Sequence, residues 1–307
     1  MIHANSLTEV SPNRPTLLTI GSFDGVHLGH QHLLRSLVAE ARAQNARAAV
    51  VTFFPHPSVV LRGRKSSFYI NTADEQAALL AGLGLDLAVT HPFSLELSQI
   101  AAGEFVERLL AALNFTELWC GADFALGHNR EGTVPWLTRY GEQHGYAVRV
   151  IEPKEVGGEI VSSSRVRRAL AEGDVAQAAA CLGRPYSLPG TVVEGVKRGR
   201  TLGFPTANLD FWDERACPAR GVYACRARVN DEPMDAVTNI GVRPTFEDAA
   251  LPTVEAHLPD FDGDLYGQTL RLDFIARLRA EQKFDDVDAL LTQMRQDIAN
   301  AREILKA

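Results

Sequence analysis

The sequence predicts a chain of the α/β plus β class: a parallel α/β domain, then a small antiparallel β-barrel that ends in a helix. Short apolar segments alternate with amphipathic helical ones over the first half, a rhythm typical of βαβ units. After Leu182 the segment GRPYSLPG interrupts the helical pattern, and short strand-like stretches continue to about residue 282. The 307 residues are enough for two cores. We therefore predict two domains, at residues 1–183 and 184–307.

Apolar, β-branched stretches predict the strands of the first domain, because each is too short for a helix and the intervening segments have helical spacing. Thr72 and Glu75 form a predicted capping box at the start of one helix, and Phe105 and Leu109 lie on the apolar face of another. Such aliphatic stripes indicate core packing. The expected strands cover residues 17–20, 48–53, 85–90, 117–120 and 147–151.

Short, evenly spaced strands separated by turn residues predict the antiparallel barrel of the second domain. A final helical segment, residues 285–305, carries Leu290, Leu291, Met294 and Ile298 on one face. The expected barrel strands cover residues 190–196, 222–229, 236–241, 254–258 and 270–274.

Charge and composition exclude several classes of protein. The net charge of −7 argues against a general nucleic-acid or anionic-membrane surface, so local positive groups must hold anionic ligands. The N-terminus lacks a signal-peptide pattern and no run of about 18 apolar residues occurs, which predicts a cytoplasmic protein that does not engage membranes. The four cysteines show no CxxC spacing and are expected to be reduced thiols. Weak self-association into a homo-oligomer is left open.

The segment GSFDGVHLGH, residues 21–30, predicts a phosphate site where the first strand turns into a helix. Gly21 and Gly25 permit positive φ and close approach of a ligand, and the N–H groups of the new helix favour an anion. His27 and His30 can donate to phosphate oxygens. The alternative is a glycine-rich connection with two incidental surface histidines.

Two further segments follow strands of the first domain, at the sheet edge where open parallel sheets bind ligands. TFFPHP, residues 52–57, places His56 between two prolines, where it can contact a ring or phosphate or be an ordinary loop histidine. GADFALGHNREGTV, residues 121–134, carries Asp123, which either contacts a ligand or caps a turn.

A third segment, VSSSRVRRAL at residues 161–170, offers hydroxyls and a guanidinium at the start of a predicted helix. Ser163, Ser164 and Arg167 can bind phosphate groups there. The alternative interpretation is an N-cap serine followed by a solvated basic face.

The second domain has its own dense segment, GTVVEGVKRGRTLGFPTANLD, at residues 190–210. Its glycines and Lys197 form a basic loop able to cover nucleotide phosphates, and Thr206 and Asn208 offer oxygens that suit magnesium. A hairpin with a basic tip is the alternative. Glu255 is a candidate base for orienting a hydroxyl, although by spacing alone it could be an exposed strand residue.

These motifs resemble those of known families. HxGH within residues 21–30 is similar to the signature of the nucleotidylyltransferase superfamily, and the longer GxFDGVHxGH pattern resembles bacterial bifunctional riboflavin kinase/FAD synthetases. GFPTAN and VEAHLPDF, around residues 203–208 and 254–261, are similar to riboflavin kinase motifs. The VSSSRVR segment resembles ISSTxIR, with Ser164 replacing a threonine but keeping its hydroxyl. The resemblance covers nearly the whole chain.

The resemblance implies a Rossmann-like nucleotidylyltransferase domain that converts FMN and ATP to FAD, and a barrel that converts riboflavin and ATP to FMN, both with Mg²⁺. It assigns His27, His30, Arg167 and Glu255 to catalysis, with Thr206 and Asn208 as metal ligands. The flavin contacts it implies are Pro55, His56, Pro57 and Arg243. The implied ATP and phosphate contacts are Gly21, Phe23, Asp24, Gly29, Asp123, Ser163, Ser164, Gly195, Lys197, Gly203, Thr206 and Asn208.

Two other functions are compatible with parts of the sequence. One is a monofunctional FMN adenylyltransferase whose barrel only binds flavin, and the other is a flavin-responsive binding protein. The presence of Thr206, Asn208 and Glu255 argues against the first. The presence of HxGH and Arg167 argues against the second.

Overall fold

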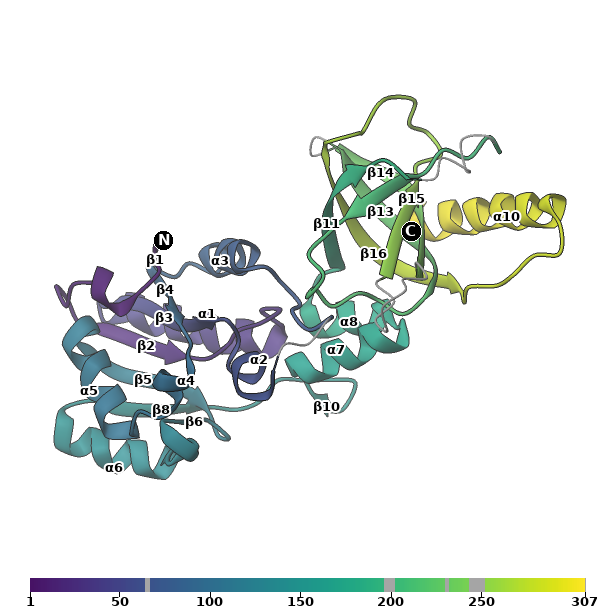
Figure 1. The fold of residues 1–307 in the computed structure, drawn as a ribbon. Coiled ribbons are helices and arrows are strands. Elements are labelled where there is room, and N and C mark those ends of the chain that lie inside the picture. The colour runs from purple at the N-terminus through teal and green to yellow at the C-terminus, as the bar shows by residue number, and fades with distance from the viewer. Residues whose placement is uncertain (64–66, 196–201, 230–231, 243–251, 307) are drawn as a thin grey trace. The chain divides into compact units, whose positions relative to one another are not determined.

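The computed structural model describes residues 1–63, 67–195, 202–229, 232–242 and 252–306. Its contacts divide the chain into two compact units (Figure 1). The first comprises Met1–Lys65 and Asn71–Ser162, and the second comprises Ser66–Ile70 and Ser163–Ala307. Residues 163–183 thus make their contacts with the second unit, while the predicted domain boundary at residues 183 and 184 stays a prediction.

The first unit is built on a six-stranded sheet in the order β1-β4-β3-β2-β5-β8, and every neighbouring pair is parallel. This confirms the parallel α/β class. The edge strand β1 was not expected, because it has only three residues and two of them are exposed. The strands are β1 (Ile2–Ala4), β2 (Thr16–Ile20), β3 (Arg47–Phe54), β4 (Leu87–Pro92), β5 (Phe115–Gly121) and β8 (Ala147–Ile151).

Helices cover both faces of this sheet (Figure 1). Successive residues of β2 point to opposite faces, so Leu17 and Leu18 belong to different hydrophobic clusters. Leu17 packs in the cluster that includes Leu34 of α1, and Leu18 in the one that includes Leu109 of α5. The helices are α1 (Leu28–Ala43), α2 (Pro57–Arg62), α3 (Ala73–Gly82), α4 (Leu95–Ser98), α5 (Ala102–Leu113) and α6 (Val134–His144).

The strand order reverses direction at β2, which lies between β3 and β5. Ligands of open α/β sheets bind at such a switch point, outside the carboxyl ends of the strands. The loops that follow β2, β3 and β5 therefore share one edge, and these are the loops that carry the predicted motifs. Smaller elements of this unit are η1 (Leu7–Glu9), β6 (Ala125–Leu126), η2 (His128–Arg130), β7 (Gly132–Thr133), β9 (Glu155–Val156) and β10 (Glu159–Ile160).

The second unit contains a closed antiparallel barrel in the order β11-β12-β15-β14-β13-β16, which confirms the predicted barrel. Tyr186, Tyr223 and Phe274 are fully buried in it. The C-terminal helix α10 packs Ala301 and Leu305 against Ala224 of the barrel. The elements are α7 (Ser163–Glu172), α8 (Val175–Leu182), β11 (Tyr186–Val193), β12 (Ala207–Asp210), β13 (Gly221–Val229), β14 (Glu232–Val242), β15 (Pro252–His257), β16 (Thr269–Arg279) and α10 (Val287–Lys306).

A short piece of the N-terminal half, residues 67–70, also belongs to the second unit. Tyr69 forms a bridge with Arg215, and the backbone N–H of Ala216 donates to the Tyr69 carbonyl at 2.8 Å. The Tyr69 ring stacks on Trp212 with 4.7 Å between ring centroids. No motif in the sequence predicted this pairing, because it joins residues about 145 positions apart that carry no local signature.

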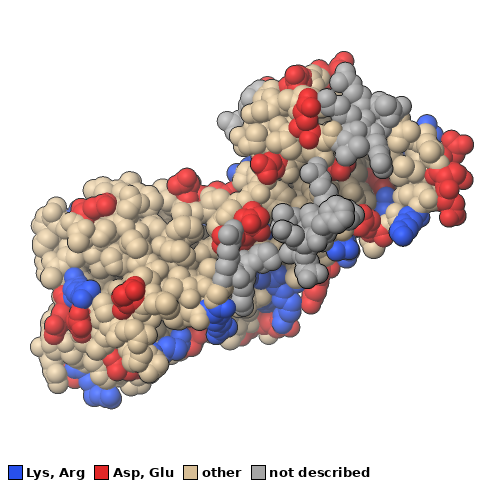
Figure 2. All heavy atoms as spheres, viewed as in Figure 1, with Lys and Arg blue, Asp and Glu red and all other residues tan. Residues whose placement is uncertain are grey.

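The four cysteines are free, and Cys120, Cys181 and Cys225 are buried, as expected for reduced thiols. On the face shown in Figure 2, acidic and basic side chains are interspersed. In the ranges that the structure describes, no helix is long and apolar enough to cross a membrane.

Candidate active sites

Two stacked histidines, His27 and His30, lie where the loop after β2 enters α1. His27 is the N-cap of α1, and its Nδ1 accepts a hydrogen bond from the backbone N–H of His30 at 3.3 Å. The two imidazole rings lie 3.6 Å apart between centroids, with 19° between their planes. Because an accepting Nδ1 carries no proton, the neutral His27 ring holds its proton on Nε2, which is then a donor. The histidine pair thus both begins the helix and presents a donor.

The backbone of this loop is unusual. Phe23 and Val26 adopt positive φ angles of 46° and 40°, in the left-handed region that non-glycine residues rarely use, and Gly25 has φ 83°. Burial in the core offsets this strain, since Phe23 and Val26 are 3% and 1% exposed. A β-carbon on Gly21 would lie 3.1 Å from the Phe23 ring, so the position favours glycine.

Asp24 and Gly29 also hold the backbone of this loop in place. The Asp24 carboxylate is 4% exposed and accepts from the Asn71 N–H at 3.2 Å, which ties the loop to the start of α3. A β-carbon on Gly29 would lie 3.1 Å from the His27 ring. Both residues therefore shape the loop, and their predicted contact with ATP stays a prediction.

The loop after β3 carries the predicted flavin contacts. His56 is the N-cap of α2, where its Nδ1 accepts from the Ser58 N–H at 3.0 Å, and Pro57 is the first residue of that helix. Pro55 follows a cis peptide bond. Phe54, at 39% exposure, is one of the more exposed large apolar residues. An exposed aromatic ring beside a rigid loop is suited to contact a planar ligand.

The loop after β5 is packed against the start of α5. A β-carbon on Gly127 would lie 2.6 Å from the Ala102 backbone, and the Glu131 carboxylate accepts from the Ala102 N–H at 2.7 Å. Asp123 is exposed, and its carbonyl accepts from the Arg130 guanidinium at 2.8 Å. Burial, together with the charge of Asp123, raises the pKa of the Cys120 thiol to about 11. Asp123 therefore stands on a fixed loop beside an inert thiol.

The serine and arginine motif opens α7, as predicted: Ser163 is the first residue of that helix. Arg167 donates through Nε to the Phe68 carbonyl at 2.7 Å, and its guanidinium carbon lies 4.0 Å from the centre of the Phe68 ring. These contacts lie within the second unit. The expected approach of Ser164 and Arg167 to phosphates held by the histidine pair stays a prediction.

In the barrel, three polar side chains lie in one row across neighbouring strands. Asn208 of β12 pairs with Glu255 of β15, which in turn pairs with Asn239 of β14. The next row, Leu209, Val254 and Ile240, is buried, and successive residues of a strand face opposite ways. Asn208, Glu255 and Asn239 thus share the face opposite to the barrel core. The structure brings together the two predicted residues Asn208 and Glu255.

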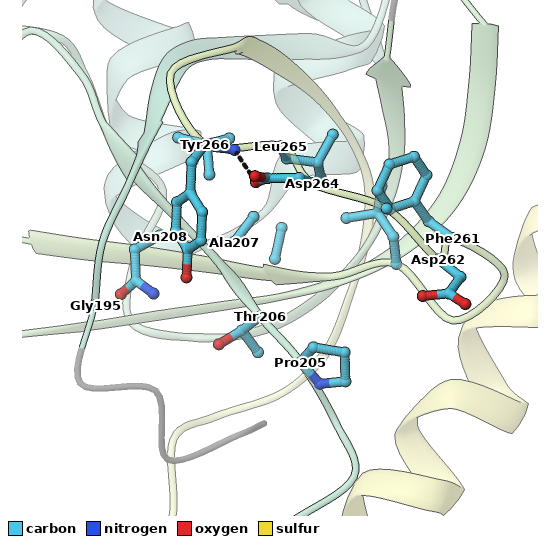
Figure 3. A pocket seen from close by; sticks show the side chains of 14 residues that line it. Gly195, Pro205, Thr206, Ala207, Asn208, Phe261, Asp262, Asp264, Leu265 and Tyr266 are labelled. Atoms are coloured by element: carbon cyan, nitrogen blue, oxygen red, sulfur yellow. Dashed lines mark hydrogen bonds between the residues drawn. The ribbon is translucent and has the colours of Figure 1, made fainter. Parts of the chain in front are cut away.

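A cavity of about 560 Å³ lies on one side of this row. Figure 3 shows Thr206, Asn208 and Tyr266 gathered on one side of it and Asp262 on the other. Gly195 also lines it, and a β-carbon there would collide with the Asn208 side chain. Gly203, with φ 82°, begins the approach to β12, whereas Lys197 and Arg243 lie outside the described residues.

Thr206 also lines a second cavity, of about 280 Å³. Glu255 and Asn239 contribute to this cavity from the sheet, and Arg279 joins them from β16. The opposite wall is α10, which lines the cavity with Leu290, Met294 and Ile298 of its predicted apolar face. The two cavities thus share Thr206; the larger one borders Asn208 and the smaller one borders Glu255.

A buried ion pair holds α10 beside this second cavity. The guanidinium of Arg279 donates to both carboxylate oxygens of Asp297, at 2.8 to 3.1 Å, and Asp297 is 3% exposed. Gln293 donates to the same carboxylate at 2.9 Å. Neither residue was singled out from the sequence, because the pairing depends on how α10 docks.

Sequence reasoning also missed Phe261, Asp262 and Tyr266, which line the larger cavity. The Asp264 carboxylate accepts from the Tyr266 N–H at 2.9 Å and so fixes the turn that presents this tyrosine. The repeated glycine and aspartate in LPDFDGDLYG were the available signal, since they predict a tight turn.

The donor set around Thr206 fits a magnesium ion carried by a nucleotide. Magnesium prefers oxygen ligands and usually takes only one or two from the protein, the others coming from phosphates and water. The Thr206 hydroxyl and the Asn208 amide oxygen can supply these. Within the described ranges, no cluster of three or more His, Cys, Asp or Glu side chains offers an all-protein metal site.

The first unit has a phosphate-type turn at the switch point of a parallel sheet, and the barrel has a polar row beside two cavities. Together these features are those of a nucleotide-using enzyme with two sites. Two family models match this chain: FAD synthetase over residues 9–165 and riboflavin kinase over residues 182–305. These matches, together with the relatives described next, show that the chain belongs to the family of bifunctional riboflavin kinase/FMN adenylyltransferases.

Relatives with that name match almost the full length of the chain. The protein from Pseudomonas fluorescens is 38% identical, with 95% of this chain and 94% of the relative covered. The protein from Listeria monocytogenes is 35% identical, with 93% and 91% covered, and the one from Escherichia coli K12 is 35% identical, with 95% and 94% covered. A crystal structure of a Streptococcus pneumoniae protein named macrolide-efflux protein matches with a TM-score of 0.90 and 30% identity, over 98% of each chain.

Proposed function

We infer that this chain catalyses two successive reactions: it phosphorylates riboflavin with ATP to give FMN, and then adenylylates FMN with a second ATP to give FAD and pyrophosphate. Both family models and the near full-length relatives support this pair of activities. The structural observation that carries the kinase half is the pair of cavities that share Thr206 beside Asn208 and Glu255.

In the barrel, ATP occupies the larger cavity and riboflavin the smaller one. The apolar residues of α10 suit the flat isoalloxazine ring. Glu255 accepts the proton of the ribityl hydroxyl as that oxygen attacks the γ-phosphorus of ATP, and ADP leaves as the bond to the bridging oxygen breaks. Thr206 and Asn208 hold the phosphates and magnesium at the junction of the two cavities. Magnesium, when bound, supplies charge that stabilises the transferring phosphoryl group.

In the first unit, the FMN phosphate attacks the α-phosphorus of ATP in line, and pyrophosphate leaves. No covalent enzyme intermediate is needed, so positioning and charge stabilisation account for catalysis. His27 and His30 stabilise the α-phosphate and the leaving group. We also assign phosphate binding to Ser163, Ser164 and Arg167, and contact with the adenosine side to Asp123.

The flavin for this second reaction binds beside Pro55, His56 and Pro57, with the exposed ring of Phe54 next to them. Arg243 is the proposed flavin contact in the barrel. A cytoplasmic location, and the absence of nucleic-acid and membrane partners, remain predictions from the sequence.

Product analysis tests the proposal. Purified protein is incubated with riboflavin, ATP and magnesium while chromatography follows FMN and FAD. We expect FMN to appear first and FAD to accumulate after it. A protein that converts added FMN to FAD but leaves riboflavin unchanged would be the monofunctional adenylyltransferase, and one that makes neither product would be only a binding protein.

A further inference from the structure

One carbonyl in the phosphate-type loop, that of the half-buried Ser22, is contacted by two side chains from outside the loop. The Ser22 carbonyl accepts from the Gln76 amide nitrogen at 2.7 Å, and the Thr52 hydroxyl lies 3.0 Å from it. Gln76 is 8% exposed and Thr52 is 1% exposed, so both side chains that reach this carbonyl are themselves buried. The Thr52 hydroxyl also lies 3.4 Å from the Gln76 amide oxygen, which links the three groups.

Gln76 is itself held in a fixed place by the start of α3. The Thr72 hydroxyl accepts from the Glu75 N–H at 3.2 Å, and the Glu75 carboxylate accepts from the Thr72 N–H at 2.8 Å. This capping box orders the first turn of the helix, in which the Gln76 N–H donates to the Thr72 carbonyl at 3.0 Å. The donor that reaches Ser22 is therefore rigidly mounted.

The loop needs such support because its backbone is strained. The residue after Ser22 is Phe23, whose φ of 46° lies in the left-handed region, and Val26 has φ 40°. Strained conformations persist only where the surroundings over-determine them. A trans peptide is planar with its C=O and N–H on opposite sides, so holding the Ser22 carbonyl also fixes the direction of the Phe23 N–H.

We propose that Gln76, assisted by Thr52, is a positioning residue for adenylyl transfer. Its amide holds the peptide between Ser22 and Phe23 so that the loop presents its N–H groups to the ATP phosphates in the geometry of the transition state. This inference rests on the proposed assignment of the loop to ATP. Gln76 touches no substrate in this account and acts through the backbone of the loop.

The test replaces Gln76 with methionine, which keeps the length and volume of the side chain but removes the donor. We expect kcat for conversion of FMN to FAD to fall about 10- to 100-fold, because small misplacements of binding groups cost that much in rate. Phosphorylation of riboflavin by the same preparation should change less than about twofold, since its site lies in the other unit.

A matched control is Gln44→Met. Gln44 donates to Glu117 at 3.1 Å from the far end of α1, about 24 Å along the helix from the loop. This variant should lose stability without losing adenylylation. Equal losses of adenylylation in Gln44→Met and Gln76→Met would show a general effect on folding and overturn the proposal.

Further variants keep the test decisive where Gln76→Met does not fold. Thr52→Ser retains the hydroxyl and should keep the adenylylation rate, whereas Thr52→Val removes it and should lower kcat more than it changes KM for ATP. A Thr52→Val protein with the kcat of the parent would contradict the proposal. If the parent itself fails to adenylylate FMN, the assignment of the loop to ATP has failed instead.

Discussion

Gly195 lies against the side chain of Asn208, where a β-carbon has no room. The atoms nearest to such a β-carbon are those of the Asn208 amide group, which would have to turn away from its present position. Glycine is therefore required at this position by a close approach of the loop to a proposed magnesium ligand. The sequence pointed to Gly195 as part of a glycine-rich loop but gave no reason for this particular glycine.

We predict that Gly195→Ala lowers kcat/KM for riboflavin phosphorylation about 10- to 100-fold, because the displaced Asn208 no longer holds magnesium and phosphate in place. Steady-state assays with riboflavin and ATP measure this, and the rate from FMN to FAD should be unaffected. Gly82→Ala is the control, since a β-carbon at Gly82 meets nothing within 4 Å. Unchanged kinase activity in Gly195→Ala would contradict the assignment of Asn208 to the proposed site.

The single residues that could be predicted from the sequence are those that lie in short local motifs. His27, His30 and the Thr72 capping box are visible in short segments, and the structure shows helices beginning at these places. Gln76 and Thr52 were not predicted, because each acts on a carbonyl that lies elsewhere in the sequence. Glu255 could be tied to Asn208 only once the strand register was known.

At the scale of elements, α10 forms one wall of the smaller barrel cavity and is held beside it by a largely buried ion pair. Arg279 and Asp297 have side chains that are 20% and 4% exposed. Removal of the carboxylate leaves a largely buried guanidinium without its partner, which is costly. The exposed pair of Arg302, on the same helix, and Asp260, which follows β15, offers a comparison, with side chains that are 45% and 69% exposed.

We predict that Asp297→Ala lowers the stability of the second unit by about 3 kcal/mol and raises KM for riboflavin. Asp260→Ala should cost less than about 1 kcal/mol, as exposed pairs do. Denaturant unfolding and kinase kinetics measure both effects. If the two variants prove equally stable, the pair does not anchor α10.

In the first unit, Asp86 joins two elements, accepting from Arg42 of α1 at 2.8 Å and from the Ala48 N–H of β3 at 2.9 Å. Partial burial acts to raise the pKa of Asp86. The hydrogen bonds from Arg42 and Ala48 and the charges of Arg42 and Arg14 outweigh this, and the pKa is lowered. A carboxyl with a lowered pKa in the folded state stabilises the fold above its unfolded pKa of about 3.9.

That stabilisation is lost as the pH falls through the lower folded pKa of Asp86. We therefore predict that Asp86→Asn is less stable than the parent at pH 7 and that the difference narrows below about pH 4. Calorimetry of both proteins from pH 7 to pH 3 measures this. A difference in Tm that is independent of pH would contradict the assignment.

Most elements of both units could be predicted from the sequence because their apolar periodicity is local, and the strand at Ala147–Ile151 has the expected bounds. The strand Ile2–Ala4 and the pairing of residues 67–70 with the barrel could not, since neither has enough residues for a periodic pattern. The apolar face of α10 was predicted, but its place in a cavity wall was not, because hydrophobic spacing does not distinguish a core from a cavity wall.

At the scale of the whole molecule, two active sites in one chain account for two reactions, of which the first makes the substrate of the second. Each unit has its own core and its own candidate phosphate site. The FMN made in the barrel is the acceptor that the first unit uses. The central claim is therefore that each step can be abolished without the other.

Two variants of the purified chain test this claim most directly, each assayed with riboflavin and, separately, with FMN. We predict that Glu255→Gln loses at least about 100-fold in riboflavin phosphorylation, as expected for removal of a general base, but converts added FMN to FAD at the parental rate. His30→Ala should do the reverse and accumulate FMN. If either single change stopped both steps in a chain that remains folded, the two-site account would be wrong.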